Sequence, residues 1–213
     1  MRKMGAEWKK RILSLHRKAP EKVQSLQHFR DAAVLMPLVE KDRKLFLLFE
    51  VRSSSIAQGG EICFPGGRIE KNETAGDAAL RETCEELCLT EDQVHLISPM
   101  HRMGAPGGGE VTSFLGTLSD YQGTYEKDEV DHVILVPLSF FAETEPKICQ
   151  AKMCVALPDD FPCELIPGGK NYPFRSVPRT FYFYQTEQGV IWGMTAELVF
   201  NLIETLKEDG ILS

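Results

Sequence analysis

Residues Gly67–Leu89 read GRIEKNETAGDAALRETCEELCL. A glycine turn leads into a segment that carries Arg81, Glu82, Glu85 and Glu86 within six residues. At about 100° per residue on a helix, the three glutamates fall within an arc of roughly 100°, where like charges repel each other. A cation makes such an arrangement favourable, and Mg²⁺ is typically shared between carboxylates and substrate phosphates. The stretch therefore predicts a metal site that receives a phosphorylated ligand.

Length and composition are those of a globular protein. The chain has 213 residues, of which 43% are apolar and 26% are charged, so one large domain or two small ones can bury a core. It contains no apolar run of 18 residues, and a membrane span is not expected. The opening residues, MRKMGAEWKK, lack the apolar stretch of a secretory signal. We therefore expect a cytoplasmic protein without a membrane partner.

Charge and cysteine spacing argue against several classes of protein. The net charge of −7 disfavours a general nucleic-acid binder, and it means that an anionic substrate needs local cations. The six cysteines include no CxxC pair, and no histidine lies close to two of them, which disfavours a zinc site. Free thiols in a reducing compartment are expected. The sequence leaves a homodimer open.

The pattern of apolar residues predicts both strands and helices. An amphipathic helix at 6–18, ended by Ala19-Pro20, is expected either to dock on the body or to form a basic patch or organelle address. A loop at 53–67 is expected to lead into an acidic helix at 74–88. Further strands are predicted at 31–39, 44–52, 93–101, 110–118, 132–137, 181–185 and 190–192, and further helices at 138–142 and 195–208.

This order of elements predicts an α/β (α+β) fold in which helices flank a mixed sheet, because strands alternate with helices and loops without a regular βαβ rhythm. We expect residues 1–20 to form an N-terminal helical extension and residues 21–213 to form a single domain. An irregular insertion is expected at about 146–178, a segment that contains six prolines.

The acidic stretch resembles the Nudix box, a pattern written G-x5-E-x7-R-E-U-x-E-E-x-G-U, in which U is aliphatic. Seven of the nine fixed positions hold over 23 residues. Thr83 replaces an aliphatic residue, and Cys88 stands where glycine is usual. Because that glycine normally helps the chain to leave the helix, a locally different helix end is expected. The resemblance implies a Nudix-type α/β/α sandwich and a pyrophosphohydrolase acting on phosphorus-containing anhydrides.

Two further stretches resemble elements of the family members that cleave coenzyme A. A pattern close to LLTxRS-x3-R-x3-G-x3-FPGG matches from Leu48 through Arg52-Ser53 to residues 64–67, but Ile56 occupies the place of its second arginine. Residues 191–196, IWGMTA, look like an IWG-x-TA element. These likenesses imply hydrolysis of coenzyme A or acyl-CoA to 3′,5′-ADP and (acyl-)4′-phosphopantetheine. The missing arginine favours the alternative of ADP-ribose, NADH or an oxidised nucleotide as the small-molecule nucleotide substrate.

The resemblance also implies which residues bind a cofactor. In the Nudix family, box carboxylates hold Mg²⁺ or Mn²⁺ together with the carbonyl of the glycine before the box. Glu82, Glu85 and Glu86 are therefore the expected carboxylate ligands, and Gly66 supplies the carbonyl. A glycine pair at Gly66 and Gly67 suits this role, because glycine lets the backbone approach an ion or a substrate without obstruction.

Other residues are assigned supporting and catalytic roles. Arg81 is expected to hold a glutamate by a bidentate contact, and Glu73 to support the fold of the motif. Arg52, at a strand end that leads toward the box, is expected to meet a substrate phosphate or to be an ordinary surface charge. Family members take their base either from the box or from a distal loop. Glu82 is therefore the first candidate and Glu129 the second, with Glu126 behind it.

Several residues have a structural interpretation beside the functional one. Trp192 is expected to pack in the core and Thr195 to cap the last helix. The aromatic residues of the irregular insertion are expected to stack on an adenine or to cover the sheet; they are Phe161, Tyr172 and Phe174. A non-catalytic nucleotide-sensing or protein-binding module is a further alternative, although such modules usually lose box carboxylates and this chain retains them all.

Overall fold

The computed structural model describes residues 4–14, 31–105 and 108–212. Its helices are α1 (Met4–Leu13), α2 (Ala75–Leu87), α3 (Leu138–Glu143) and α4 (Gly193–Glu208), with short 3₁₀ turns η1 (Glu91–Gln93), η2 (Cys163–Leu165) and η3 (Gly169–Asn171). Its strands are β1 (Ala32–Lys41), β2 (Lys44–Arg52), β3 (Ile62–Cys63), β4 (Gly66–Arg68), β5 (Val94–Gly104), β6 (Glu110–Leu118), β7 (Val130–Pro137), β8 (Lys147–Met153), β9 (Val177–Thr186) and β10 (Gly189–Trp192). None of the described helices has the length and apolar character needed to span a membrane.

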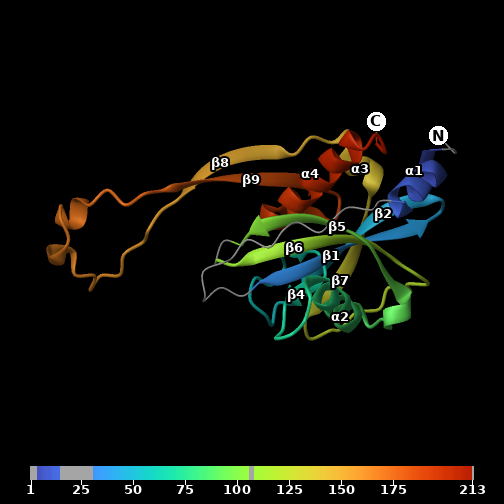
Figure 1. The fold of residues 1–213 in the computed structure, drawn as a ribbon, viewed down its shortest axis with the longest axis horizontal. Helices are drawn as coiled ribbons and strands as arrows, with labels where there is room; N and C mark the ends of the chain where they lie inside the picture. Colours follow the sequence, from blue (N-terminus) through green and yellow to red (C-terminus); the bar gives the residue numbers. More distant parts are fainter. Residues whose placement is uncertain (1–3, 15–30, 106–107, 213) are drawn as a thin grey trace.

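Seven strands form a mixed sheet that divides at one place (Figure 1). β1 runs parallel to β6 and antiparallel to β2 and β4, while β2 also pairs with β3 and β7. The register between β1 and β2 covers Leu38 to Lys41, and on the far side of it the two strands separate. β4 then pairs with β1, and β3 pairs with β2. The segment between them, which contains Pro65, therefore enters the sheet at this fork.

The sheet lies between α2 on one face and α4 on the other (Figure 1). One apolar cluster beneath α2 includes Leu35, Leu48 and Leu87, and a larger cluster on the α4 side includes Leu47 and Phe49. Successive side chains of a strand point to opposite faces, so Glu50 shares with Leu48 the face that α2 covers. The α/β/α layering with a mixed sheet confirms the predicted fold class.

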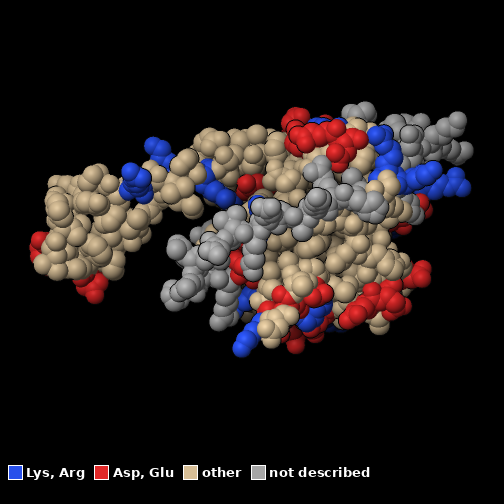
Figure 2. Space-filling view, in the orientation of Figure 1, with Lys and Arg blue, Asp and Glu red and all other residues tan. Residues whose placement is uncertain are grey.

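A second sheet packs on the outer side of α4 and extends into an arm. Its antiparallel strands are ordered β10-β9-β8, and Tyr182 of β9 stacks on Phe200 of α4 with ring centroids 4.7 Å apart. Residues 147–180, which we call the arm, project well beyond the body (Figure 1). Figure 2 shows that the surface of the arm is mostly uncharged, whereas acidic side chains gather along the edge of the body that carries α2.

The predicted elements are all present among the described residues, and three strands occur where none was expected. β3 and the start of β4 lie in the predicted loop at 53–67, and β8 lies in the segment predicted to be irregular. α1 ends at Leu13, where Ile12 is 1% exposed and belongs to the main core. The predicted continuation at 15–18 and the stop at Ala19-Pro20 lie outside the described residues, and the division at residue 20 stays a prediction.

The predictions for the C-terminal motif and for the aromatic residues need correction. Trp192 is 41% exposed rather than packed in the core. Thr195 does not cap the last helix, because α4 begins at Gly193 and its N-cap position makes no side-chain hydrogen bond. The aromatic residues of the arm do not cover the sheet. They contact one another, with the ring of Phe174 at 6.4 Å from Phe161 and 4.8 Å from Tyr172.

Candidate active site

Helix α2 carries the box acids, and local contacts fix both of its ends. At the start, the hydroxyl of Thr74 accepts the backbone N–H of Asp77 at 3.2 Å, and the carboxylate of Asp77 accepts the N–H of Thr74 at 3.2 Å. This reciprocal capping box satisfies N–H groups that have no partner within the helix. At the end, Cys88 has a left-handed backbone with φ 51° and ψ 49°, and the N–H of Leu89 donates to the carbonyl of Cys84 at 2.9 Å.

The structure accommodates both departures from the box pattern, Thr83 and Cys88, without disturbing the helix. The predicted change in the helix end is wrong, because Cys88 adopts the left-handed conformation that a glycine takes at this position. A side chain in that conformation is strained by about 1–2 kcal/mol. Thr83 is fully buried in place of an aliphatic residue, and its hydroxyl donates to the carbonyl of Ala79 at 2.6 Å. The buried hydroxyl therefore has a partner.

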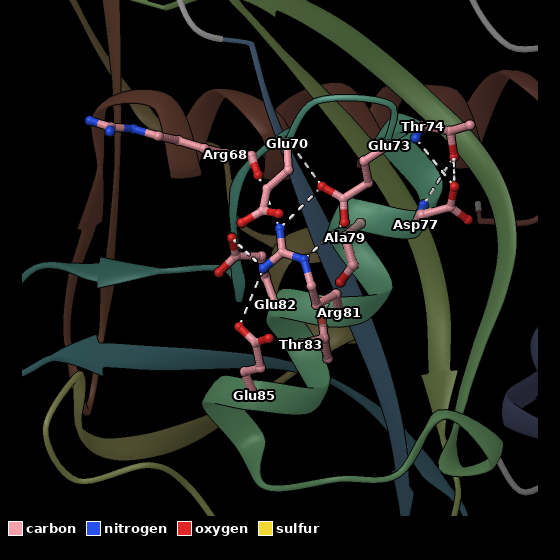
Figure 3. A network of polar contacts seen from close by, with 10 residues as sticks. All are labelled: Arg68, Glu70, Glu73, Thr74, Asp77, Ala79, Arg81, Glu82, Thr83 and Glu85. Atoms are coloured by element: carbon pink, nitrogen blue, oxygen red, sulfur yellow. Dashed lines mark hydrogen bonds and ion pairs between the residues drawn. The ribbon is translucent and has the colours of Figure 1, made fainter.

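Arg81 lies at the centre of a network that holds three glutamates (Figure 3). Its Nε and Nη2 contact the two carboxylate oxygens of Glu73 at 2.8 and 3.2 Å, which is a bidentate contact. Its Nη1 contacts Glu82 at 3.0 Å and Glu85 at 3.3 Å. The same guanidinium donates to the carbonyl of Arg68 at 3.1 Å. One side chain thus connects the turn before α2 to two acids on the helix.

The glycine pair brings the backbone against two of these acids. Gly66 has φ +146°, and its N–H donates to Oε2 of Glu86 at 2.8 Å. A Cβ at Gly66 would overlap the carbonyl of Ala33, and a Cβ at Gly67 would overlap the carboxylate of Glu82. The fork in the sheet therefore places both glycines where no side chain fits.

Two buried carboxyl groups lie behind the glycines, and one of them belongs to strand β2. Glu86 is 5% exposed and Glu50 is 1% exposed. Burial raises the pKa of both carboxyls, and the charge of Glu50 raises the pKa of Glu86 further. Oε1 of Glu50 accepts a hydrogen bond from the thiol of Cys63 at 3.2 Å. Sequence reasoning missed Glu50, although a single acid in the apolar run KLFLLFEVR was a usable signal.

A cleft of about 920 Å³ opens in front of these groups. Its lining contains six of the residues predicted for the site, namely Arg52, Gly66, Gly67, Glu82, Glu86 and Glu129. It also contains Arg68 and Lys71, two cations that no sequence pattern singled out. Glu85 is absent from the lining and 62% exposed, and it contacts Arg81 instead. Its role as a metal ligand stays a prediction.

Burial and position do not single out one candidate base. Burial raises the pKa of Glu82, which suits a proton acceptor that works near neutral pH. Glu129 lines the same cleft, and its carbonyl accepts the N–H of Ser53 at 2.8 Å, which places it beside the end of β2. Arg52, at that strand end, donates from Nε to the carbonyl of Ala57 at 3.0 Å. Glu126 is not part of the lining.

The chemistry of the cleft fits a divalent cation, although its acids do not converge on one point. In residues 4–14, 31–105 and 108–212, no group of three His, Cys, Asp or Glu side chains is arranged to hold an ion. Glu82 contacts Arg81 instead. Glu50 is not part of the lining, but it acts on Glu86, which is, and its Oε2 is buried with no hydrogen-bond partner within the described part of the chain. A buried carboxylate oxygen without a partner is costly, and a hard cation is a partner of the right chemistry.

Comparison with known proteins places these features in a family. A model of the Nudix domain matches residues 28–152. The peroxisomal coenzyme A diphosphatase NUDT7 of Mus musculus is 33% identical over 172 residues, which cover 78% of this chain and 66% of that protein. Nudix hydrolase 3 of Caenorhabditis elegans is 29% identical over 83% of this chain and 73% of its own length.

Solved structures of similar fold are more distant in sequence. A MutT/nudix family protein from Enterococcus faecalis has a TM-score of 0.49 and 14% identity, and the match covers 90% of this chain and 66% of that one. An Ap4A hydrolase from C. elegans, solved as a binary complex, has a TM-score of 0.46 and 21% identity over 51% of this chain and 80% of that one. Neither likeness bears on the substrate.

Proposed function

The chain belongs to the Nudix hydrolase family, and we propose that its substrate is coenzyme A or an acyl-CoA. Hydrolysis of the diphosphate would release 3′,5′-ADP and (acyl-)4′-phosphopantetheine. The name of the mouse relative supports this substrate, as do the partial sequence patterns that end in Phe64-Pro65-Gly66-Gly67 and in residues 191–196. Membership of a family of hydrolases, together with a full set of box carboxylates, leaves the non-catalytic alternative without support.

The observation that carries the proposal is the mixture of charges in one cleft. Three cationic side chains line it, namely Arg52, Arg68 and Lys71, together with the acids Glu70, Glu82, Glu86 and Glu129. A diphosphate needs positive partners for its oxygens, and its hydrolysis needs an acid that accepts a proton. The lining supplies both within about 920 Å³, although the whole protein has a net charge of −7.

Nudix hydrolases generally use divalent metal ions, and we propose Mg²⁺ or Mn²⁺ for this chain. Glu82, Glu86 and the carbonyl of Gly66 would hold the ion, and Glu85 would join them by leaving Arg81. When bound, the ion would supply positive charge to the diphosphate oxygens and lower the pKa of water. Because Gly67 has no side chain, the backbone leaves the carboxylate of Glu82 room beside it.

The remaining roles follow from position in the cleft. Arg52 would bind a phosphate oxygen from the end of β2, and Arg68 and Lys71 would do so from the turn that precedes α2. Glu82 or Glu129 would accept the proton of the attacking water, since both line the cleft. Arg81 would hold the turn and the helix together through its bidentate contact with Glu73.

A second substrate class is favoured by one specific departure. Ile56 stands where the coenzyme A pattern has its second arginine, so a contact to an anionic group of coenzyme A is missing. A substrate without the 3′-phosphate of coenzyme A, such as ADP-ribose, NADH or an oxidised nucleotide, does not need that contact. The alternative is therefore another dinucleotide-like pyrophosphate cleaved by the same residues.

A substrate screen separates the two. The full chain is incubated with coenzyme A, acetyl-CoA, ADP-ribose, NADH and 8-oxo-dGTP, each with Mg²⁺ and with Mn²⁺, and the products are separated by ion-pair chromatography. We expect 3′,5′-ADP from the coenzyme A compounds at a kcat/KM at least tenfold above that for the others. Intact coenzyme A beside a cleaved ADP-ribose or NADH would overturn the proposed substrate and leave the family assignment in place.

We also propose a cytoplasmic location, and the sequence leaves a homodimer open. The name of the mouse relative assigns that protein to peroxisomes, so microscopy of the fluorescently tagged chain with a peroxisomal marker decides between the two compartments. Light scattering of the purified chain at micromolar concentration tests the dimer. A mass of 24 kDa rather than twice that value would contradict it.

A further inference from the structure

We propose that Glu50 is a further carboxylate of the cation site and binds the divalent ion together with Glu86. The inference rests on the proposed function, because it assumes that Glu86 holds an ion. Glu50 lies outside the box, on strand β2, and no motif in the sequence marks it. In the coenzyme A pattern its position is a threonine, so the acid is a feature of this chain rather than of that pattern.

The burial of Glu50 requires an explanation in itself. Only 1% of the residue is exposed, although a carboxylate that is removed from water without compensation costs several kcal/mol. The thiol of Cys63 donates to Oε1 at 3.2 Å, and this bond fixes the orientation of the carboxyl group. Oε2 is buried and has no hydrogen-bond partner among the described residues. A buried polar atom without a partner is rare in native proteins and points to a missing ligand.

The surroundings of that oxygen indicate what the ligand is. Three charged residues act on Glu50: the cation Arg52, the acid Glu129, and Glu86, whose carboxyl can share a hydrogen bond with that of Glu50 when one of the two is protonated. Both acids line the cleft. The guanidinium of Arg52 has another partner, because its Nε donates to the carbonyl of Ala57. Glu86 is 5% exposed, and its carboxylate accepts the N–H of Gly66. Two buried carboxylates that interact repel each other when both are ionised. A small divalent cation between them removes that repulsion.

The position of Glu50 explains why it can serve the same ion. β2 and β3 pair at Glu50 and Cys63, and β4 begins three residues later at Gly66, whose carbonyl belongs to the proposed site. The fork in the sheet therefore brings Glu50 of β2 and Gly66 of β4 close to Glu86 of α2, whose carboxylate accepts the N–H of Gly66 and is acted on by Glu50. The competing explanation is a proton shared between Glu50 and Glu86, with no part in metal binding.

The test measures metal affinity rather than activity. Mn²⁺ is titrated into the purified full chain and the free ion is measured by electron paramagnetic resonance. The Glu50→Gln variant keeps the shape of the side chain and removes its charge. We expect its Kd for Mn²⁺ to be about tenfold or more above that of the wild type. Glu61→Gln is the matched control, because Glu61 lies two residues before Cys63 and, unlike Glu50, is partly exposed; its Kd is expected to stay within twofold.

The melting temperature of the variant provides a second test. In EDTA at pH 8, Glu50→Gln is expected to melt at a higher temperature than the wild type, since it lacks the buried carboxyl whose ionisation destabilises the folded chain as the pH rises, and added Mn²⁺ is expected to raise its melting temperature less. An unchanged Kd in Glu50→Gln overturns the inference and supports the shared proton. If that variant fails to fold, Glu50→Asp replaces it; it keeps the charge but withdraws it by one methylene, and an unchanged Kd again overturns the inference.

Failure of this inference is distinguishable from failure of the proposed function. Glu86→Gln is included in the same titration. If Glu86→Gln loses Mn²⁺ affinity and Glu50→Gln does not, the cation site stands without Glu50. If the wild type binds no Mn²⁺ and cleaves no pyrophosphate, the proposed function itself is wrong.

Discussion

The cleft and the arm differ in how far their residues are fixed by neighbours. In the cleft, Gly66 and Gly67 have no room for a side chain, and Glu86 is 5% exposed with its carboxylate bound to a backbone N–H. The arm instead leaves large apolar side chains in solvent, among them Leu165 at 77% and Val155 at 53% exposure. A small change in side-chain volume must displace neighbouring atoms in the cleft, whereas on the arm the solvent accommodates it.

The large sheet and the small sheet also differ in what they support. The large sheet carries the site at the fork between β1 and β2, where an opening in the ladder admits the glycine turn. The small sheet is anchored by Tyr184, which is 1% exposed, and then continues outward as the arm. We therefore expect substitutions in the cleft to change catalysis or folding and equivalent substitutions on the arm to change neither.

The largest expected effect is on catalysis. Glu86→Gln should lower kcat by about 10³-fold, because a buried charge that helps to hold the ion is lost while the side-chain volume is kept. Asp159→Asn on the arm makes the same chemical change at an exposed position and should leave kcat within twofold. The rate at which 3′,5′-ADP forms from coenzyme A, followed by chromatography, measures both values. A Glu86→Gln variant with more than a tenth of the wild-type rate would contradict the assignment of the site.

A paired leucine truncation tests the contrast in stability. Leu87, at the end of α2, is fully buried, and Leu87→Ala should lower the free energy of unfolding by about 2–5 kcal/mol. Leu165→Ala on the arm should change it by less than about 0.5 kcal/mol, because the side chain is 77% exposed. Urea denaturation followed by fluorescence gives both values. A comparable loss in the two variants would mean that the arm is buried in solution.

Gly67→Ala probes the close approach of backbone and acid. A Cβ at this position overlaps the carboxylate of Glu82, so either Glu82 or the turn must move. A displacement of about 1 Å in a catalytic site can cost about 10²-fold in rate, and we expect a loss of that size in kcat/KM. Gly104→Ala, at a position where a Cβ meets nothing within 4 Å, is the control and should retain full activity. Normal activity in Gly67→Ala would show that Glu82 moves freely.

The box region was predictable because two independent signals coincide there. The acidic helix is predicted at 74–88 by the spacing of its acids and by the resemblance to the box, and it is observed as Ala75–Leu87, with a capping box at Thr74 that starts it. Gly67, Glu82 and Glu86 could be selected by their spacing in the motif. The contact between Arg81 and Glu73 likewise joins two positions of that motif.

The parts that sequence reasoning missed lack such signals for physical reasons. β3 and β4 contain two and three residues, too few to show a period of two. β8 has no buried residue on either face, so its sequence does not alternate between apolar and polar. Arg68 and Lys71 are surface charges that only the folded turn brings to the cleft. Glu50 is the exception, because a single acid inside an apolar strand is visible in the sequence, although its partner Cys63 lies in the segment predicted to be a loop.

The metal-free protein should lose stability as the pH rises. Burial raises the pKa of Glu50 and Glu86 above the ordinary value of 4.5, so the folded chain keeps protons that the unfolded chain has released. The free energy of unfolding is then highest below about pH 4.5 and falls as the pH rises through the raised values. Urea denaturation in EDTA between pH 5 and 8 measures how steeply the free energy of unfolding falls with pH. Glu50→Gln should make it shallower, and an equal slope in both proteins would contradict burial of these two carboxyls as the cause.

The smallest effect is expected at the end of α2, where the sequence departs from the box pattern. Cys88 holds a left-handed backbone that strains a side chain, and Cys88→Gly should raise the free energy of unfolding by about 1 kcal/mol. Cys154→Gly on the arm makes the same replacement at a residue without positive φ, and it should give no gain because glycine only loosens the unfolded chain there. Urea denaturation at one pH compares the two. A gain at Cys154 equal to that at Cys88 would attribute the effect to loss of the thiol rather than to the conformation of the helix end.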